Sequence, residues 1–342
     1  MYTVIYVREP DQRFPRGIRG LGRRIKYSLP NPIFEGQDGF IRGALHSVFN
    51  VKEMSIYEFE RLGAKAHYDF IFVNVKADPM RKGVRLEDLG FLSRVNVPKI
   101  LVDTRAQSEN ISCLEILEKF DLIYKREPYL DRGKYGIPAL FADRIMPTML
   151  AIPNLRYISK WIDKASKIEC AIGSKPIDVF FSGSGTSKER WAALDSFVGS
   201  PLNTDFSLVP KKNNNRRCKS EYLKQSLLSY EKYLQRIYEA KINLVIPGYG
   251  VFTYRHLETL ALGAFFVTAS KIRELELLIP IKEGKHYVCY EDPHDASAIC
   301  EEALRSLSGC DTTRAERSRV FWEDYDVRLH GQDILRQVVN LR

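Results

Sequence analysis

The first half of the chain alternates short hydrophobic runs with stretches whose apolar positions recur at helical spacing. The runs predict strands at residues 3–7 (TVIYV), 68–75 (YDFIFVNV), 97–104 (VPKILVDT) and 120–126 (FDLIYKR). Within each run the apolar residues are continuous rather than alternating, which is typical of parallel strands covered on both faces. The stretches GFIRGALHSVF, IYEFERLGAKA and CLEILEKF lie between the runs and predict helices.

A segment rich in proline and glycine follows, and the alternation then starts again. The segment LDRGKYGIPALFADRIMPTMLAIPNL predicts an irregular linker, and RYISKWIDKASKI after it predicts a helix. Strands are predicted for PIDVFF, FSLVP, INLVIP, AFFVTA and HYVCY. Helices are predicted for SKERWAALDSF, EYLKQSLLSYEKYLQRIYEA, FTYRHLETLALG, IRELELLI, DASAICEEALRSL and, in two pieces, RAERSRVFWEDYDVRLHGQDILRQVVNL.

Two successive sets of strand–helix units predict an α/β fold with two doubly wound, Rossmann-like domains facing a cleft. We expect an N-terminal domain over residues 1–155 and a C-terminal domain over residues 170–310. Residues 311–342 are expected to form helices that pack back toward the N-terminal domain. A length of 342 residues suits two domains of this size.

The net charge of +9 adds a preference for anionic partners. Basic residues gather in KKNNNRRCK (211–219) and in the segment that follows the first predicted strand, which includes Arg16, Arg19, Arg23 and Arg24. Such patches attract phosphates, nucleic acid or anionic membrane surfaces, and the alternative is that they are only solvated loops.

Other sequence features point to a cytoplasmic protein. The sequence contains no run of about 18 apolar residues, and its first residues lack the regions of a secretory signal peptide. Its six cysteines form no CxxC pair and no zinc-like cluster with histidines. We therefore expect reduced cysteines and no transmembrane segment.

The candidate chemistry lies in IPGYGVFTYRHLETLALGAFFVTAS (246–270). Gly248, Tyr249 and Gly250 form a turn at the carboxyl end of a predicted strand, where ligands of open α/β sheets bind. The glycines let the backbone approach a ligand closely. Thr253 follows at a predicted helix start, where its hydroxyl either caps the helix or binds a phosphate.

Two charged residues share one face of the helix that follows this turn. Arg255 and Glu258 lie three positions apart. An arginine near the positive end of a helix is electrostatically disfavoured unless an anion binds there. A glutamate on the same face can accept two hydrogen bonds from a vicinal diol such as a ribose. The alternative is an ion pair between the two, which would contribute only about 0.2–0.5 kcal/mol.

These residues resemble the donor-binding half of GT-B glycosyltransferases, with exostosin-like and spore-maturation-type enzymes as the nearest groups. The resemblance covers residues 176–310. The matching positions are Gly248, Gly250, Thr253, Arg255, Glu258, Gly263, Gly284, Tyr287, Tyr290, Asp292 and Pro293. It implies that the arginine contacts the diphosphate of a nucleotide sugar and that the glutamate holds the ribose.

A second glycine turn fits the same site. In FFSGSGTSKER, Gly183, Ser184 and Gly185 separate a predicted strand from a predicted helix. In GT-B enzymes the corresponding loop faces the donor phosphates, whereas the alternative is a plain turn. The stretch is not a P-loop, because GxxxxGK[ST] is absent.

The remaining predictions concern a metal, a cofactor and a general base. Asp324 and Asp326 match a DxD motif, but their predicted helical surroundings favour a chance match. The GT-B resemblance implies no metal and no cofactor besides the nucleotide-sugar co-substrate, because arginines and helix N-termini neutralise the leaving group. An inverting enzyme needs a general base, for which Asp103 and Glu9 are candidates at strand ends. A retaining enzyme would need none, and the stereochemistry stays open.

The combined hypothesis is a glycosyltransferase that moves a sugar from a nucleotide diphosphate donor to an acceptor hydroxyl. The arginines at 16, 19, 23 and 24 favour an anionic glycan or a lipid-linked acceptor. One alternative is a nucleic-acid-binding protein, or a glycosyltransferase that modifies DNA bases. Another is a non-catalytic member that keeps the fold for binding.

Overall fold

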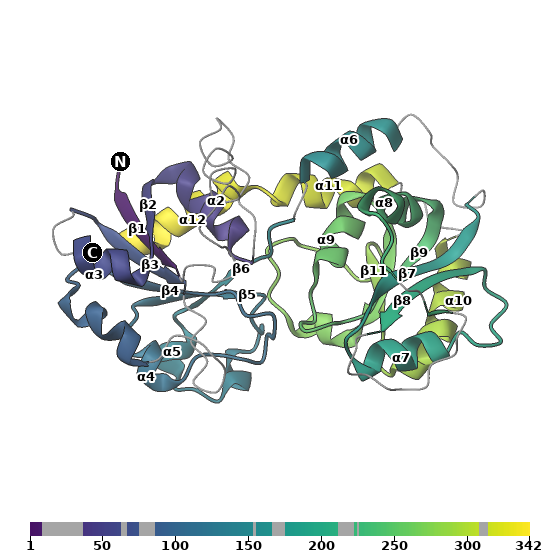
Figure 1. Cartoon of the computed structure of the whole chain (residues 1–342). Coiled ribbons are helices and arrows are strands. Elements are labelled where there is room, and N and C mark those ends of the chain that lie inside the picture. Colours follow the sequence, from purple (N-terminus) through teal and green to yellow (C-terminus); the bar gives the residue numbers. More distant parts are fainter. Residues whose placement is uncertain are drawn as a thin grey trace. The chain divides into compact units, whose positions relative to one another are not determined.

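The computed structural model, drawn in Figure 1, describes most of the chain as two compact units. It describes residues 1–8, 37–62, 67–74, 86–152, 155–165, 175–210, 222–223, 226–307 and 314–342. The first unit comprises Met1–Pro153, Leu275–Leu278 and Asp326–Arg342, and the second comprises Asn154–Glu274 and Ile279–Tyr325. Within the described ranges, no helix combines the length and the apolar composition that crossing a membrane requires.

The described strands of the first unit form a six-stranded parallel sheet in the order β2-β1-β3-β4-β5-β6. The strands are β1 (Thr3–Arg8), β2 (Asn50–Met54), β3 (Phe70–Asn74), β4 (Lys99–Asp103), β5 (Leu122–Arg126) and β6 (Ile145–Thr148). The helical segments are α2 (Gly39–Val48), α3 (Ile56–Leu62), η2 (Leu86–Arg94), α4 (Leu114–Leu117), η3 (Arg132–Tyr135), α5 (Ala139–Ala142) and α12 (Val327–Val339).

Both faces of this first sheet are buried, which explains its continuous apolar strands. Along β1, Val4 and Tyr6 belong to the hydrophobic cluster that includes residues of α2 and α12. The alternate residues Ile5 and Val7 belong to the opposite cluster, which includes residues of α3, η2 and α4. Because each strand residue faces one covered layer or the other, alternation of polar and apolar residues disappears.

The second unit has a five-stranded parallel sheet in the order β11-β10-β9-β7-β8. The strands are β7 (Ile177–Gly185), β8 (Thr204–Pro210), β9 (Ala240–Val245), β10 (Phe265–Ala269) and β11 (Tyr287–Tyr290). The helical segments are α6 (Leu155–Ala165), α7 (Lys188–Asp195), α8 (Tyr230–Glu239), α9 (Tyr254–Ala261), η6 (Ser270–Glu274), η7 (Pro293–Asp295), α10 (Ala296–Leu307) and α11 (Arg314–Asp324).

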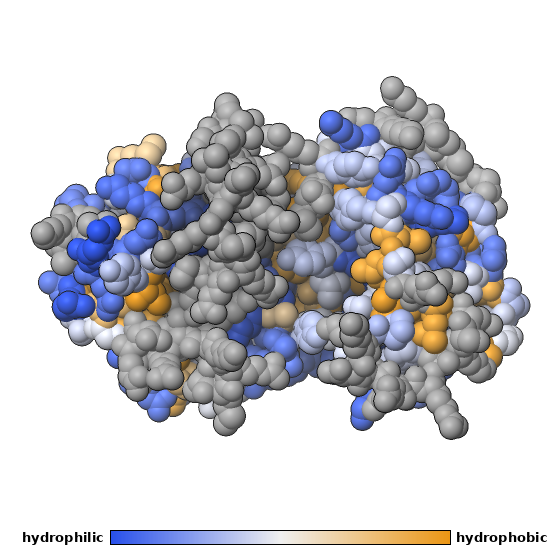
Figure 2. Space-filling view, viewed as in Figure 1, coloured by the Kyte–Doolittle hydropathy of each residue, from blue (hydrophilic) through white to orange (hydrophobic). Residues whose placement is uncertain are grey.

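Helices also cover both faces of the second sheet. Val179 and Phe181 of β7 share a hydrophobic cluster with residues of α7 and α10. Phe180, between them, contacts the ring of Tyr233 on α8. In the face that Figure 2 draws, hydrophilic residues occupy most of the described surface and hydrophobic residues show in smaller patches. This surface is consistent with a charged-residue content of 28%.

The structure departs from the predicted elements at two edge strands. Strand β2 was not predicted because its sequence, NVKEM, has no continuous apolar run, and all five of its residues are at least partly exposed. Strand β6 lies inside the segment predicted to be an irregular linker. It contains Pro147 and forms an edge of the sheet, where a missing backbone N–H is tolerated.

Two predictions about helices also need correction. The predicted helix IRELELLI is only the 3₁₀ segment η6, and Leu275–Leu278 belongs to the first unit, where Leu275 pairs with Tyr129. The two C-terminal helices divide between the units, since α11 lies in the second and α12 in the first.

Candidate functional site

The strand order of the second sheet identifies where its ligand site is expected. The chain runs from β7 to β8 on one side and then to β9 on the other side of β7. In open parallel sheets, ligands bind outside the carboxyl ends of the strands at such a topological switch point. The candidate site therefore lies where β7 and β9 end.

A pocket of about 360 Å³ opens at this position, and we call it the switch-point pocket. Its lining residues come from the end of β7, from α7, from the start of α9, and from α8 with the residues that precede it. They are Ser182, Gly183, Ser184, Arg190, Leu227, Leu228, Tyr230, Tyr233, Thr253, Tyr254, Arg255 and Glu258. The pocket is thus built from the second unit alone.

Arg190, in the first turn of α7, spans the switch point with its guanidinium. Nη1 donates a hydrogen bond of 2.6 Å to the carbonyl oxygen of Ser184, near the end of β7. Nε donates to the carbonyl of Pro247 at 3.1 Å and Nη2 to that of Ile246 at 3.3 Å, just beyond β9. The side chain is buried. One buried cation therefore connects the two strand ends.

Among the described residues, no carboxylate pairs with the guanidinium of Arg190 or Arg255. Across the part of the chain that the structure describes, neither forms an ion pair. Burial and the neighbouring charge of Arg255 lower the pKa of Arg190 to about 10. Both residues also lie in the first turn of a helix, where the macrodipole disfavours cations. The arrangement therefore favours an anionic ligand such as a phosphate or a diphosphate.

Arg255 is held by aromatic rings. Its guanidinium lies 4.7 Å from the ring centroid of Phe181, and Nε donates to the hydroxyl of Tyr233 at 3.3 Å. The structure records no ion pair between Arg255 and Glu258, both of which it describes. The ion pair considered as an alternative in the sequence is therefore absent, and the guanidinium faces the pocket.

Glu258 is buried and bound by two tyrosines of α8. Tyr230 donates its hydroxyl to Oε1 at 2.9 Å, and Tyr233 donates to Oε2 at 2.9 Å. Burial raises the pKa of Glu258, and these two hydrogen bonds and the charge of Arg255 oppose that rise. Each carboxylate oxygen thus accepts a hydrogen bond from one hydroxyl, the kind of donor that a vicinal diol also offers.

Two of the predicted glycines make room for the arginines. A Cβ at Gly183 would lie 3.0 Å from Nη2 of Arg255, and one at Gly248 would lie 2.8 Å from Nη2 of Arg190. Gly185 has a different neighbour, because a Cβ there would lie 2.6 Å from Cζ2 of Trp191. Gly185 therefore serves the packing of α7 rather than the pocket.

The start of α9 is fixed by a buried histidine. Thr253 is the N-cap residue, and its backbone N–H donates to Nδ1 of His256 at 3.0 Å. Nε2 of His256 lies 3.1 Å from Oγ1 of Thr268. Burial and the charge of Arg255 lower the pKa of His256 to about 3. The imidazole is therefore neutral, and its role here is to orient the helix that carries Arg255 and Glu258.

Of the other predicted site residues, those that the structure describes do not line the switch-point pocket. Tyr249 is 61% exposed, and the carbonyl of Gly250 accepts a hydrogen bond from the backbone of Gly248. Asp103 lies in the first unit, buried at the end of β4. The structure does not describe the remaining predicted residues, which are Glu9, Arg16, Arg19, Arg23 and Arg24.

Sequence reasoning missed seven of the lining residues, and three of them make the polar contacts described above: Arg190, Tyr230 and Tyr233. Arg190 had a usable signal, because it is a cation in the first turn of a helix, the same argument that singled out Arg255. Tyr230 and Tyr233 gave no signal of their own. Only the packing of α8 beside α9 brings their hydroxyls to Glu258.

The DxD match at the C-terminus has a structural role. Asp324 ends α11, and Asp326 caps α12 by accepting a hydrogen bond from the backbone N–H of Arg328 at 2.7 Å. In the described ranges, no group of three or more His, Cys, Asp or Glu side chains is arranged to hold a metal ion.

Comparison with solved structures identifies the fold. Sucrose-phosphate synthase from Thermosynechococcus elongatus is 10% identical, with 100% of both chains covered and a TM-score of 0.58. The DNA-modifying enzyme β-glucosyltransferase, solved with and without uridine diphosphoglucose, is 13% identical, with 99% of both chains covered and a TM-score of 0.52. An α-glucosyltransferase in complex with UDP and a 13-mer DNA is 10% identical, with 99% of this chain and 100% of that chain covered and a TM-score of 0.50.

At these identities the similarity is one of fold. The sequence matches no protein-family model and no curated protein. The predicted fold is confirmed: the chain is an α/β protein with two Rossmann-like domains of the GT-B type. The narrower resemblance to exostosin-like and spore-maturation-type enzymes stays a prediction.

The buried His256 predicts a loss of stability in acid. A histidine in the unfolded chain has a pKa of about 6.5. Between that pH and about 3, the unfolded state binds a proton that the folded state does not, so the free energy of unfolding decreases as pH decreases. The slope from this group approaches about 1.4 kcal/mol per pH unit.

Urea unfolding at several pH values, for the wild type and His256→Gln, checks this prediction. We expect the stability advantage of the wild type to shrink steadily from pH 7 to pH 4. His294→Gln, at an exposed position of the same unit, controls for removal of a histidine as such. An advantage that stays constant over this range would show that the buried imidazole is not the titrating group.

Proposed function

We propose that this protein is a glycosyltransferase that moves a sugar from a nucleoside diphosphate sugar to an acceptor hydroxyl. The observation that carries the proposal is a pair of cations, Arg190 and Arg255, at the switch point of the second sheet. Neither has a carboxylate partner within the described part of the chain. A diphosphate is a ligand whose charge suits two neighbouring guanidiniums. The fold shared with sugar transferases supports the same reading.

The roles of the pocket residues follow from their chemistry. As the bond between the sugar and the diphosphate breaks, negative charge grows on the departing phosphate oxygen. Arg190 and Arg255 would stabilise that charge from positions fixed before the reaction. This supply of positive charge supports a reaction without a bound metal and without a further cofactor.

Glu258 would bind the ribose hydroxyls, as the family resemblance implies. Tyr230 and Tyr233 now donate to its two oxygens. A ribose diol would either replace these donors or share the carboxylate with them. Gly183 and Ser184, which line the same pocket, would bring backbone groups near the phosphates.

The class of acceptor that we propose rests on the positive charge of the chain. The basic segment that includes Arg16, Arg19, Arg23 and Arg24 and the net charge of +9 favour an acceptor that carries phosphate, carboxylate or a polyanionic chain, such as an anionic glycan or a lipid-linked sugar. A second candidate is a hydroxyl on a modified DNA base. The same charge supports it. Two proteins that share this fold are a DNA-modifying β-glucosyltransferase and an α-glucosyltransferase solved in complex with DNA.

Removal of the Arg255 guanidinium should weaken nucleotide binding. Calorimetry with UDP, GDP, TDP and ADP identifies the preferred nucleotide. For that nucleotide we expect Arg255→Ala to raise Kd about 10- to 100-fold, because a hydrogen bond to a charged group contributes about 1.5–3 kcal/mol. Arg255→Lys should recover only part of the loss, since a point charge lacks the guanidinium fork.

The matched control is Arg273→Ala, which removes an exposed arginine paired with Glu283 and Glu291 in the same unit. It should leave the nucleotide Kd unchanged. If no nucleoside diphosphate binds the wild type better than millimolar, the proposed function is wrong.

Binding measurements on the wild type and on a charge-neutralised variant of the basic segment distinguish the two acceptor classes. A duplex DNA whose affinity falls steeply with salt would support the second candidate. In that case the triple variant of Arg19, Arg23 and Arg24 to Gln should flatten the slope of log K against log salt by up to about 3. Binding to an acidic polysaccharide but not to DNA, with the same loss in the variant, would support the first candidate. The triple variant should bind the nucleotide as tightly as the wild type does. A loss of nucleotide affinity in the variant would assign the basic segment to donor binding.

A further inference from the structure

The first sheet has its own topological switch point, and a carboxylate lies at it. The chain runs from β1 to β2 on one side, and β3 pairs with β1 on the other side. Arg8 ends β1 and Asn74 ends β3. Asp38, immediately before α2, is within hydrogen-bonding distance of Asn74 and 4.0 Å from the Arg8 guanidinium. This is the edge at which a ligand of the first unit is expected.

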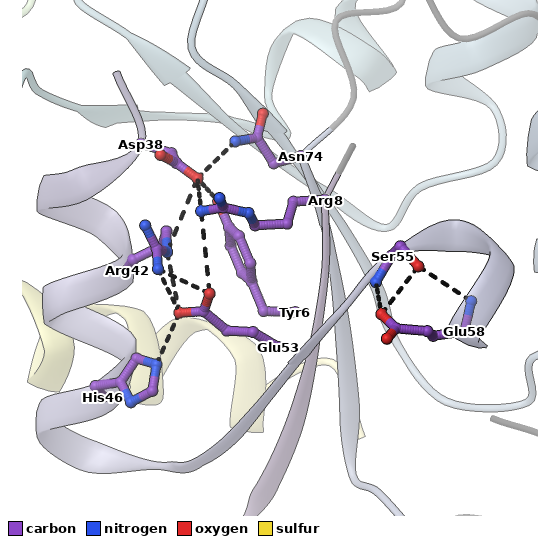
Figure 3. A network of polar contacts seen from close by, with 9 residues as sticks. All are labelled: Tyr6, Arg8, Asp38, Arg42, His46, Glu53, Ser55, Glu58 and Asn74. Atoms are coloured by element: carbon purple, nitrogen blue, oxygen red, sulfur yellow. Dashed lines mark hydrogen bonds and ion pairs between the residues drawn. The ribbon is translucent and has the colours of Figure 1, made fainter. Parts of the chain in front are cut away.

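Asp38 is held by only one of its two oxygens, as Figure 3 shows. Oδ2 accepts from the hydroxyl of Tyr6 at 3.1 Å and from Nδ2 of Asn74 at 2.9 Å. The guanidiniums of Arg8 and Arg42 each lie 4.0 Å from the same oxygen. Oδ1 accepts no hydrogen bond from the described residues, although the side chain is nine-tenths buried. Oδ1 is not fully enclosed, so it keeps some contact with solvent.

The other carboxylates at this edge are engaged or enclosed. Arg42 donates to both oxygens of Glu53. Arg105 donates to both oxygens of Asp103, so neither oxygen of this base candidate from the sequence is without a hydrogen-bond partner. Glu127 has one unpartnered oxygen, Oε1, but that atom is fully enclosed. Among these residues, Asp38 alone combines a fixed orientation with an available oxygen.

Such an arrangement is what proton abstraction requires. A general base must reach the proton with a free lone pair while its own position is fixed by neighbouring groups. Here Tyr6 and Asn74 fix Oδ2, and Oδ1 stays available. Glu53, engaged by Arg42, offsets the cationic charge beside Asp38.

We propose that Asp38 is the general base of the first unit, and the proposal rests on the proposed glycosyltransferase function. Oδ1 takes the proton of the acceptor hydroxyl as the acceptor oxygen forms its bond to the anomeric carbon. The bond from that carbon to the diphosphate oxygen breaks, and its electron pair leaves with the nucleoside diphosphate. The proton on Asp38 then passes to solvent. A single displacement of this kind inverts the anomeric configuration.

The test compares two nucleophiles, one that needs a base and one that does not. The wild type and Asp38→Asn are incubated with UDP-, GDP-, TDP- and ADP-glucose, and nucleotide release is measured with water alone and with added azide. Water must lose a proton to react, whereas azide is already an anion. We expect Asp38→Asn to release nucleotide about 10²- to 10⁴-fold more slowly with water. Its rate with azide should stay within a few-fold of the wild type, and the glycosyl azide should have the inverted configuration.

Control variants separate a base from a structural residue. Asn74→Ala removes one of the groups that fix Asp38 and should lower the water rate by about tenfold, with less effect on the azide rate. Asp103→Asn should not discriminate between the two nucleophiles. Calorimetric affinity for the nucleoside diphosphate should be unchanged in Asp38→Asn and Asn74→Ala.

The possible failures are distinguishable. If the wild type releases nucleotide from none of the four donors with either nucleophile, the proposed function fails and the assignment of Asp38 fails with it. If the wild type is active and Asp38→Asn is as fast with water, only the assignment of Asp38 fails. Two further results would overturn the assignment of Asp38. One is a decrease in the rate of Asp38→Asn that is equal with water and with azide. The other is a selective loss of the water rate in Asp103→Asn instead of Asp38→Asn.

Discussion

The geometry of the candidate site depends on one buried guanidinium bonded to backbone carbonyls. Arg190 donates to carbonyl groups at the ends of β7 and β9, and so fixes both strand ends with a charge that no described carboxylate neutralises. Arg255 lies beside it, and the two charges oppose each other, as the lowered pKa of Arg190 reflects. Backbone carbonyls supply partial negative charge but no full charge. An anionic ligand would therefore complete the electrostatics of this proposed site. Glycine at positions 183 and 248 leaves the space that the two guanidiniums occupy.

The two units apply the same topological rule with opposite charge. In each parallel sheet, the functional candidates lie at the carboxyl ends of strands that flank the switch point. In the second unit these groups are cations suited to a diphosphate. In the first they are carboxylates, most of them bound to arginines, with Asp38 held so that one oxygen remains available. Stabilisation of a leaving group and abstraction of a proton are both requirements of the glycosyl transfer that we propose.

Much of the fold was predictable from the sequence, because buried parallel strands have continuous apolar runs. The runs at residues 3–7 and 97–104 correspond to β1 and β4. Strands β2 and β6 had no such run, since both lie at sheet edges. In the site, Arg255 and Glu258 were recognisable from their spacing on one helix. The other site contacts depend on tertiary packing and could not be predicted. The partners of Glu258 come from α8. Asp38 was not recognisable because its partners lie on β1 and β3, more than thirty residues away in the sequence.

The most direct test of the central claim is the dependence of affinity on phosphate number. Calorimetry at one salt concentration with uridine, UMP and UDP, or with the matching series of whichever base is preferred, measures what each phosphate contributes. If Arg190 and Arg255 bind a diphosphate, UDP should bind at least tenfold more tightly than UMP and at least a hundredfold more tightly than uridine. A UDP affinity no greater than that of uridine would contradict the account, because it would mean that Arg190 and Arg255 serve only the packing of the second unit.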